Sequence, residues 1–325
     1  MIDLNSLPIT FRFGCRKGYG WLLILLVFFL SFLSPLSAQA DNVGVIYPEI
    51  REPYLQIFLN IKEGVEKEVG KKDQVLEYVV AKGESPEKIR KWIEKKKISA
   101  VIALGSRGIN SIAAPNSIPS VVGAAVLKPG STSYSGITLN PAPDVLLTTV
   151  VKLKPRINKI HVVYEPKVNE WVIEEAQKTL EKNNIELVSY AVDDLSSAAS
   201  AYKSIQKSID NSTEAIWLPM GGPSREKSLM QSILATAWSK DQAIISSNLS
   251  DVKRGALFSM YPDNVAMGRE LGKLLKERQH NPNAESQVVF VRSLLQAINI
   301  RTAEHIGLRF GKEELRQFEF IYPPQ

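Results

Sequence analysis

The chain has 325 residues and a net charge of +6, a mild basic excess that does not resemble the dense positive footprint of a nucleic-acid-binding protein. It has three histidines at unrelated spacings and a single cysteine, Cys15, so we expect no metal site and no disulfide. The hydrophobic content of 44% and the charged content of 23% are ordinary for a soluble globular protein.

The N-terminal segment, residues 1–40, has the three parts of a secretory signal peptide. Basic residues precede an apolar run over residues 21–36, and the small-x-small sequence Ala38-Gln39-Ala40 follows it. Pro35 interrupts the run, which is shorter than the roughly 20 residues that a membrane span needs. We expect cleavage after Ala40 and a periplasmic protein without a lipid anchor, since no cysteine stands at the cleavage point. An uncleaved membrane anchor is the alternative.

From Asp41 onward, short apolar runs alternate with amphipathic stretches. The pattern predicts strands at residues 43–47, 75–80, 100–104, 160–164, 185–192, 215–218, 243–246, 256–260 and 288–291. Between them it predicts helices at residues 54–69, after the capping residue Ser85, and at residues 169–182, 198–209, 224–238 and 262–279. Strands that are apolar throughout and separated by helices indicate an α/β protein whose parallel sheets are covered on both faces. Two such series predict two similar lobes, with a boundary near residues 128–134.

The segment Gly105-Ser106-Arg107-Gly108 is the strongest candidate binding element. It follows a strand and opens a helix, where ligands of parallel sheets usually bind. Backbone N–H groups, the Ser106 hydroxyl and the Arg107 guanidinium can converge there on a carboxylate or a phosphate. The segment matches neither a phosphate-binding loop nor a nucleophile elbow. A tight turn with a solvated arginine is the alternative.

Other candidate residues also follow predicted strands. An aromatic residue and an acid recur at two strand ends, as Tyr47 with Glu49 and as Tyr164 with Glu165, and such pairs can clamp a small polar ligand. Further strand ends carry Met220 and Gly221, Asn248, and Tyr261. Ordinary turn chemistry is the alternative for each of them.

The histidines argue against catalysis. His161 lies inside a strand, His280 in a polar turn, and His305 in a C-terminal helix, so no Ser/His/Asp set or metal pair is indicated. We expect all three to be structural, no catalytic residue, no cofactor and no enzymatic activity.

Several segments, in this order along the chain, resemble the periplasmic substrate-binding proteins of ABC importers, in the subgroup that includes tryptophan- and tyrosine-type binding proteins. They are Ala103-Leu104-Gly105-Ser106, residues 118–122, Leu153-Lys154-Pro155 with residues 160–164, Gly255-Ala256-Leu257, and Ile298-Asn299 with Ala303 and Gly307-Leu308. The chain departs from the family pattern where Met220-Gly221-Gly222 replaces a common acid, and in the loop around Ser133-Tyr134-Ser135-Gly136.

The resemblance implies a two-lobed type I periplasmic binding-protein fold with three crossings between lobes. Residues 41–139 and 262–284 would form the N-lobe, and residues 140–261 and 285–325 the C-lobe. It also implies that the candidate residues above bind a small carboxylate-bearing, amino-acid-like ligand, with Ser106 and Arg107 holding its anionic group and the tyrosines flanking it.

The expected partners are that small molecule and a membrane permease, with no nucleic acid and a monomeric chain. Three other functions stay open: a sensory binding protein that signals to a sensor kinase, a family member that binds only protein, and a periplasmic enzyme.

Overall fold

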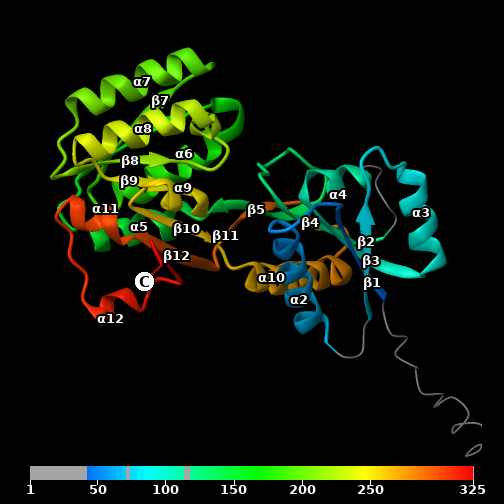
Figure 1. The fold of residues 1–325 in the computed structure, drawn as a ribbon. Coiled ribbons are helices and arrows are strands. Elements are labelled where there is room, and N and C mark those ends of the chain that lie inside the picture. Colours follow the sequence, from blue (N-terminus) through cyan, green and yellow to red (C-terminus); the bar gives the residue numbers. More distant parts are fainter. Residues whose placement is uncertain (1–41, 71–73, 113–117, 325) are drawn as a thin grey trace, which may run out of the picture. The chain divides into compact units, whose positions relative to one another are not determined.

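The computed structural model describes residues 42–70, 74–112 and 118–324 (Figure 1). The expected signal peptide and its cleavage site lie outside the described residues. Within the described ranges, no helix combines the length and the apolar character that a membrane crossing requires.

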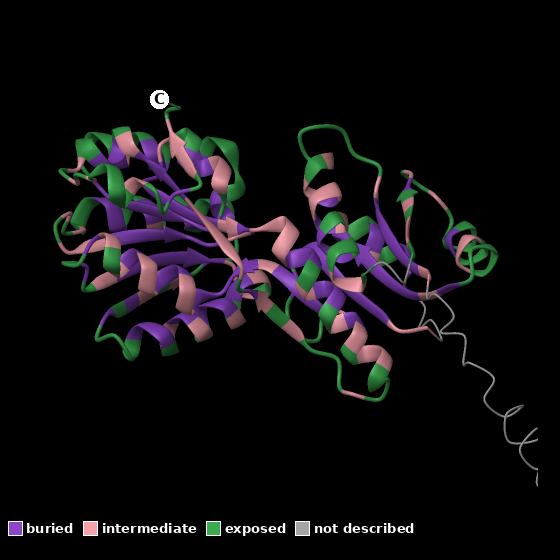
Figure 2. Cartoon of the chain, turned by 90° about the horizontal axis from the view of Figure 1, so that it is seen from below, coloured by how far each residue is buried: buried purple, intermediate pink, exposed green. Residues whose placement is uncertain are grey.

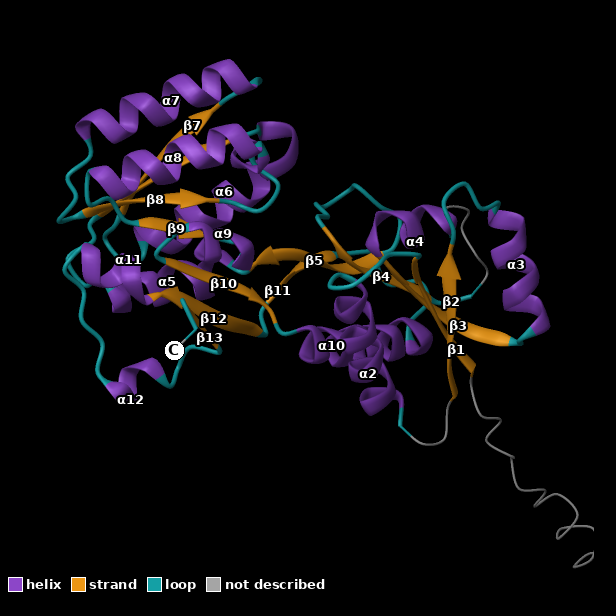
Figure 3. Ribbon diagram, in the orientation of Figure 1, coloured by secondary structure: helices purple, strands orange, loops and turns teal. Residues whose placement is uncertain are grey.

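The first sheet has six strands, all parallel, in the order β11-β5-β4-β3-β1-β2. Helices lie on both of its faces (Figure 3). The strands are β1 (Asn42–Pro48), β2 (Gln74–Val80), β3 (Ile98–Leu104), β4 (Ser120–Ala125), β5 (Ser135–Pro141) and β11 (Val288–Val291). The helices are α2 (Leu55–Val69), α3 (Pro86–Lys95), α4 (Gly105–Ser111) and α10 (Asn264–His280). We call this sheet and these helices the first lobe.

The second sheet has seven strands in the order β13-β12-β10-β9-β8-β6-β7. Its strands are β6 (Lys159–Tyr164), β7 (Glu186–Ala191), β8 (Glu214–Leu218), β9 (Ile244–Ser246), β10 (Phe258–Pro262), β12 (Leu294–Asn299) and β13 (Phe320–Tyr322). Its helices are α5 (Pro143–Leu153), α6 (Pro166–Glu181), α7 (Leu195–Ser208), the 3-10 turn η1 (Pro223–Arg225), α8 (Lys227–Ser239), α9 (Leu249–Arg254), α11 (Ile300–His305) and α12 (Lys312–Leu315). We call this set the second lobe.

The predicted fold class is confirmed: the chain has a two-lobed type I periplasmic binding-protein fold with two sheets that are mainly parallel. One strand differs from the expectation, because β12 runs antiparallel to β10. The chain passes from the first sheet to the second between β11 and β12, so β12 enters its sheet in the opposite direction. An antiparallel strand on an otherwise parallel sheet is a common arrangement.

The division of the chain between the lobes needs one adjustment. The expected boundary placed residues 285–325 in the C-lobe, but β11 pairs in parallel with β5 of the first sheet. We therefore propose that the first lobe extends to Val291 and that the last crossing lies between Val291 and Leu294. Arg292, within this crossing, forms a bidentate ion pair with Asp144 at the start of α5. Its Nη1 donates to Oδ1 at 3.1 Å and its Nη2 donates to Oδ2 at 2.6 Å. The ion pair ties the last crossing to the first.

Local sequence signals account for the helix starts and faces. The Ser85 hydroxyl accepts a hydrogen bond from the N–H of Glu87 at 3.2 Å, and Pro86 occupies the first helical position of α3. In α2, Phe58, Ile61 and Val65 recur at helical spacing and are buried.

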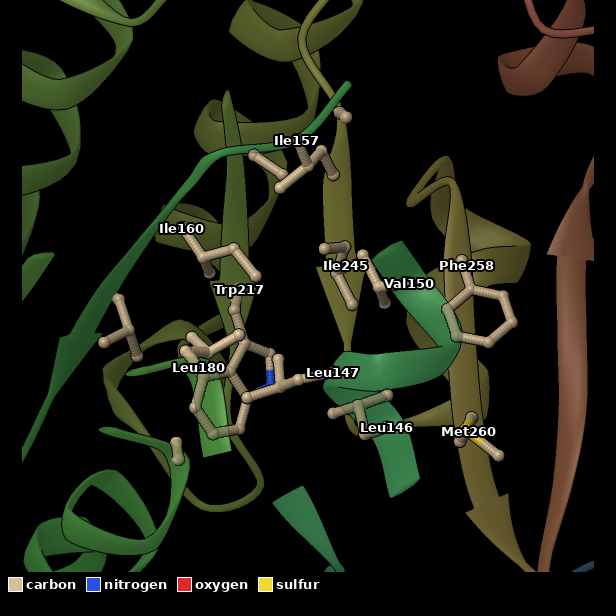
Figure 4. Packing of buried hydrophobic residues seen from close by; sticks show 14 of the residues in the cluster. Leu146, Leu147, Val150, Ile157, Ile160, Leu180, Trp217, Ile245, Phe258 and Met260 are labelled. Carbon is tan, nitrogen blue, oxygen red and sulfur yellow. The ribbon is translucent and has the colours of Figure 1, made fainter. Parts of the chain in front are cut away.

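The central strands of each sheet are buried on both faces, whereas edge strands such as β2 and β7 are partly exposed (Figure 2). Along β1, Val43 and Val45 enter one core cluster while Ile46 enters the cluster on the opposite face, as the two-residue period of a strand requires. In the second lobe, Trp217 packs among leucines of α5 in the larger of two clusters (Figure 4). The buried sheets thus position the candidate polar residues at their strand ends.

Candidate functional site

Arg107 joins the ends of two strands at the carboxyl edge of the first sheet. Its Nη1 donates hydrogen bonds to the carbonyl oxygens of Glu49, at 3.2 Å, and of Val80, at 3.5 Å. Glu49 follows β1 and Val80 ends β2, so the guanidinium spans the two strands. Ser106 and Arg107 are exposed, and a guanidinium has five N–H donors, so several remain for a ligand.

Gly105 explains the sharp turn that brings Arg107 to this edge. Its φ of +68° lies in the left-handed region, where glycine has no steric penalty. A Cβ at this position would lie 3.4 Å from the Phe58 ring and from Pro48, so the turn also packs closely against the end of β1. The predicted strand–turn–helix arrangement of this segment is present.

Tyr47 lies inside the first lobe. Its ring is 3% exposed and stacks on Phe58 with 5.7 Å between ring centroids, and its hydroxyl donates to Glu77 Oε2 at 3.1 Å. Burial, with a contribution from the neighbouring Glu77 carboxylate, raises the pKa of Tyr47 to about 12. The side chain is therefore engaged in the core.

Replacing Tyr47 with phenylalanine should change how stability depends on pH. A raised folded-state pKa stabilises the fold fully below the ordinary tyrosine pKa of about 10, and this contribution disappears as the pH rises through about 12. Wild type should therefore lose stability relative to Tyr47→Phe between pH 9 and pH 11.5 in urea unfolding. The matched control is Tyr54→Phe, because the Tyr54 ring is 61% exposed. Parallel stability curves for wild type and Tyr47→Phe would contradict the expectation.

Tyr164 holds the corresponding place in the second lobe. Its ring is 7% exposed in the core, and its hydroxyl donates to Glu170 Oε1 at 3.4 Å. Burial raises the pKa of Tyr164, as do the Glu170 and Glu174 carboxylates. The next residue, Glu165, stands at the start of α6, where its carbonyl accepts hydrogen bonds from the N–H groups of Val168 and Asn169. The Glu165 side chain lines a pocket.

That pocket, of about 370 Å³, lies beyond the carboxyl ends of β6, β7 and β8. It contains four carboxylates and one guanidinium; its lining residues are Glu165, Asp193, Asp194, Leu195, Gly222, Pro223, Arg225 and Glu226. We call it the acidic pocket. Asp194 Oδ1 accepts from the N–H of Ser197 at 2.7 Å and caps α7; hydrogen bonds from Ser197 lower the pKa of Asp194 and keep it ionised. Glu226 is the capping residue of α8.

The sequence prediction missed Asp193, Asp194, Arg225 and Glu226. A signal was present, because Asp193 and Asp194 directly follow a predicted strand, as the chosen candidates do. The sheet order β8-β6-β7 brings the loops after these three strands together, and a single sequence does not reveal that order.

Met220 and Gly221 directly precede Gly222, which lines this pocket. The Met220 carbonyl accepts from Nδ2 of the buried Asn169 at 2.8 Å. Gly221 has a φ of +75°, and a Cβ there would lie 3.3 Å from Val168 and 3.6 Å from Val126, which follows β4 of the first lobe. The positive φ favours glycine at this position, and the Val126 side chain of the first lobe lies close to it.

The remaining candidates, Asn248 and Tyr261, differ in their exposure to solvent and in the contacts that they already make. Asn248 is exposed, but its Oδ1 caps α9 by accepting from the N–H of Ser250 at 3.1 Å. Tyr261 is partly buried in β10, and burial, followed by the charges of Glu319 and Asp263, raises its pKa. Neither lines the acidic pocket.

The described residues contain no cluster of three or more histidine, aspartate, glutamate or cysteine side chains suited to a metal ion. His161 contacts Glu214 at 2.7 Å, His280 contacts the Lys276 carbonyl at 2.7 Å, and His305 contacts the Trp238 carbonyl at 2.8 Å. The groups at the two carboxyl edges can donate or accept hydrogen bonds and balance charge, which is the chemistry of reversible binding.

Two similar α/β lobes with polar groups at the carboxyl ends of their strands define a binding protein of the type I periplasmic class. A family model for ABC transporter substrate-binding proteins matches residues 60–315, so the chain belongs to that family. The sequence matches no curated protein.

Solved structures share the fold. An ABC domain from Streptococcus pneumonia in complex with L-Trp has a TM-score of 0.57 at 19% identity, covering 87% of this chain and 99% of that one. A ligand-free, open substrate-binding protein with adhesive properties from Clostridium difficile has a TM-score of 0.60 at 14% identity, covering 86% and 99%. A conserved domain protein from Vibrio cholerae has a TM-score of 0.54 at 16% identity, covering 87% and 99%. Identities this low show the fold alone.

Proposed function

We propose that this protein captures a small amino-acid-like ligand, with a carboxylate at one end and an ammonium at the other, between the carboxyl edges of its lobes. The proposal rests on an arginine at the first edge, where the exposed Glu49 also lies, and on an excess of acidic residues at the second edge. The first presents Arg107 beside Ser106, and the second presents the four carboxylates of the acidic pocket. Arg107 and Ser106 would bind the ligand carboxylate through charge-assisted hydrogen bonds. Glu165 and Asp194 would bind the ammonium.

The chain has Met220-Gly221-Gly222 where the family commonly has an acid. The carboxylates of the acidic pocket could take the place of that acid. Asp193 and Asp194 supply carboxylates from the neighbouring loop after β7. The tyrosines, by contrast, are poor candidates to flank the ligand, since the hydroxyls of Tyr47 and Tyr164 are bonded to glutamates of their own lobes. We therefore assign to Tyr47 and Tyr164 the role of supporting the strand ends.

Contacts between loops of the two lobes support a closing movement about the ligand. Lys128 Nζ, from the loop after β4, donates to the Lys167 carbonyl of α6 at 2.8 Å. The Val126 side chain lies next to Gly221, as described above, so a residue of each edge already meets the other edge. Hinge closure about three crossings is a usual response of two-lobed binders. The closed form would then deliver its ligand to a membrane permease as the binding subunit of an importer.

The same proposal places the protein in the periplasm after removal of residues 1–40. The intact mass of the exported protein should then correspond to a chain that starts close to Asp41. A full-length, membrane-bound product would contradict this location.

A thermal-shift screen tests the ligand class. Amino acids, small carboxylates, nucleobases and sugars are added separately, with aromatic amino acids first because the S. pneumonia relative was crystallised with L-Trp. A ligand at 100 times its dissociation constant adds about 2.7 kcal/mol to the free energy of unfolding, which should raise the melting temperature by several degrees. Stabilisation by a neutral sugar alone would contradict a charged amino-acid ligand. The absence of any shift would favour a family member that binds only protein.

A further inference from the structure

A second hollow lies in the second lobe and shares no lining residue with the acidic pocket. It is a groove of about 670 Å³, within the roughly 300–1,000 Å³ of small-molecule pockets. It runs along one side of α8, from Lys227 to Trp238, and is completed by the end of α9, the start of α11 and Tyr322 of β13. We call it the basic groove. None of the candidate residues for the amino-acid ligand lines it.

The charge of the basic groove has one sign. Four cationic side chains line it, Lys227, Lys253, Arg254 and Arg301, and none of its lining residues is an aspartate or a glutamate. Arg254 pairs with Asp251 Oδ1 at 3.3 Å. Among the described residues, Lys227, Lys253 and Arg301 take part in none of the ion pairs. A concave surface with several uncompensated cations attracts anions.

A fixed aromatic ring adjoins these cations. The Trp238 indole is 38% exposed and stacks on the His305 ring, with centroids 3.8 Å apart and planes 4° apart. His305 Nε2 contacts the Trp238 carbonyl at 2.8 Å and Asp241 Oδ1 at 2.9 Å, which fixes the stack. The Arg301 guanidinium carbon lies 5.0 Å from the Trp238 ring centroid. The Trp238 indole therefore contacts both the His305 ring and the Arg301 guanidinium, and the part of it that remains exposed is available to a ligand.

The buried residues that line the groove include no carboxylate that would pair with the cations. Met230 and Leu234 are buried there, and so are two polar residues whose hydrogen bonds are already made. Asn299 Nδ2 donates to the Val252 carbonyl at 2.9 Å, and Thr302 Oγ1 donates to the Gly255 carbonyl at 3.1 Å. Of the cations, Lys253 also lies over the Phe320 ring, with its Nζ 5.0 Å from the ring centroid, so an anion would have to compete only with this contact and not with a carboxylate.

We propose that the basic groove binds a small organic anion that carries a flat ring, for which a nucleoside monophosphate is a chemical model. The ring would pack against Trp238, and the anionic group would contact Arg301 and Lys253. This site is independent of the amino-acid site proposed above.

Isothermal titration with adenosine monophosphate, adenosine and inorganic phosphate tests the proposal on the purified protein. We expect adenosine monophosphate to bind at least tenfold more tightly than adenosine or phosphate, because only the nucleotide combines ring and charge. The double variant Lys253→Glu with Arg301→Glu should weaken nucleotide binding at least tenfold. Trp238→Leu, which removes the ring and leaves the charges, should weaken it several-fold. Circular dichroism and melting temperatures show whether the variants are folded, and Trp238→Leu keeps the test valid if the double variant is not.

The matched control is Lys91→Glu with Lys95→Glu, at two exposed lysines of α3, which changes the net charge equally. It should leave nucleotide affinity unchanged, and so should Arg107→Ala. The absence of nucleotide binding at 1 mM would overturn the proposal, as would equal weakening in both double variants. Loss of nucleotide binding in Arg107→Ala would instead place the nucleotide at the amino-acid site.

Discussion

Arg107→Ala should weaken ligand binding about 10- to 150-fold. A charge-assisted hydrogen bond contributes about 1.5–3 kcal/mol, and we expect the ligand carboxylate to make such a bond with Arg107. The variant also loses the bonds of the guanidinium to the carbonyls of Glu49 and Val80. Calorimetric titration with the amino acid that gives the largest thermal shift measures the effect.

Two variants separate ligand contact from structural support. Lys96→Ala removes an exposed lysine at the end of α3 and should leave the affinity unchanged. Arg107→Lys keeps the charge but cannot reproduce the planar fork, so we expect an intermediate affinity. Equal affinities for Arg107→Ala and Lys96→Ala would remove Arg107 from the site.

Gly268→Ala should lower the free energy of unfolding by about 3 kcal/mol, at the upper end of the usual cost of overpacking. Helices α2 and α10 touch through their backbones: a Cβ on Gly268 would lie 2.0 Å from the Ile61 carbonyl oxygen and 2.9 Å from the Gly64 Cα. The helices must separate to admit a methyl group, although alanine favours the helix by about 1 kcal/mol. We expect the melting temperature to fall by roughly 6–12 °C.

Lys273→Ala, at an exposed position of the same helix, controls for helix propensity and should leave the melting temperature nearly unchanged. A melting temperature of Gly268→Ala equal to that of wild type would contradict the close helix contact. Because α10 returns to the first lobe after β10 of the second, this contact helps to hold the discontinuous first lobe together.

Much of the fold could be predicted because its signals are local. The apolar strands, the Ser85 cap and the Gly105-Ser106-Arg107 turn each depend on a few neighbouring residues. The pairing of β11 with β5 and the reversed direction of β12 depend on contacts between distant segments. No local pattern in a single sequence predicts such contacts.

The candidate site, too, could be predicted only in part. A position at the end of a strand could be predicted for Arg107 and Glu165, but the direction of a side chain could not. Tyr47 lies on the same face of β1 as Val43 and Val45, so the two-residue period points its ring into the core. In a parallel sheet both faces are covered, and periodicity therefore could not separate a core tyrosine from a ligand-facing one.

A native mass spectrum of the protein, purified without refolding, tests the central proposal most directly. We expect a species heavier than the chain by the mass of one small amino-acid-like molecule, released on activation and identifiable from its fragments. The same species should be depleted in Arg107→Ala. A retained neutral sugar, or a bound molecule that persists unchanged in Arg107→Ala, would contradict the proposed pairing of a ligand carboxylate with this arginine.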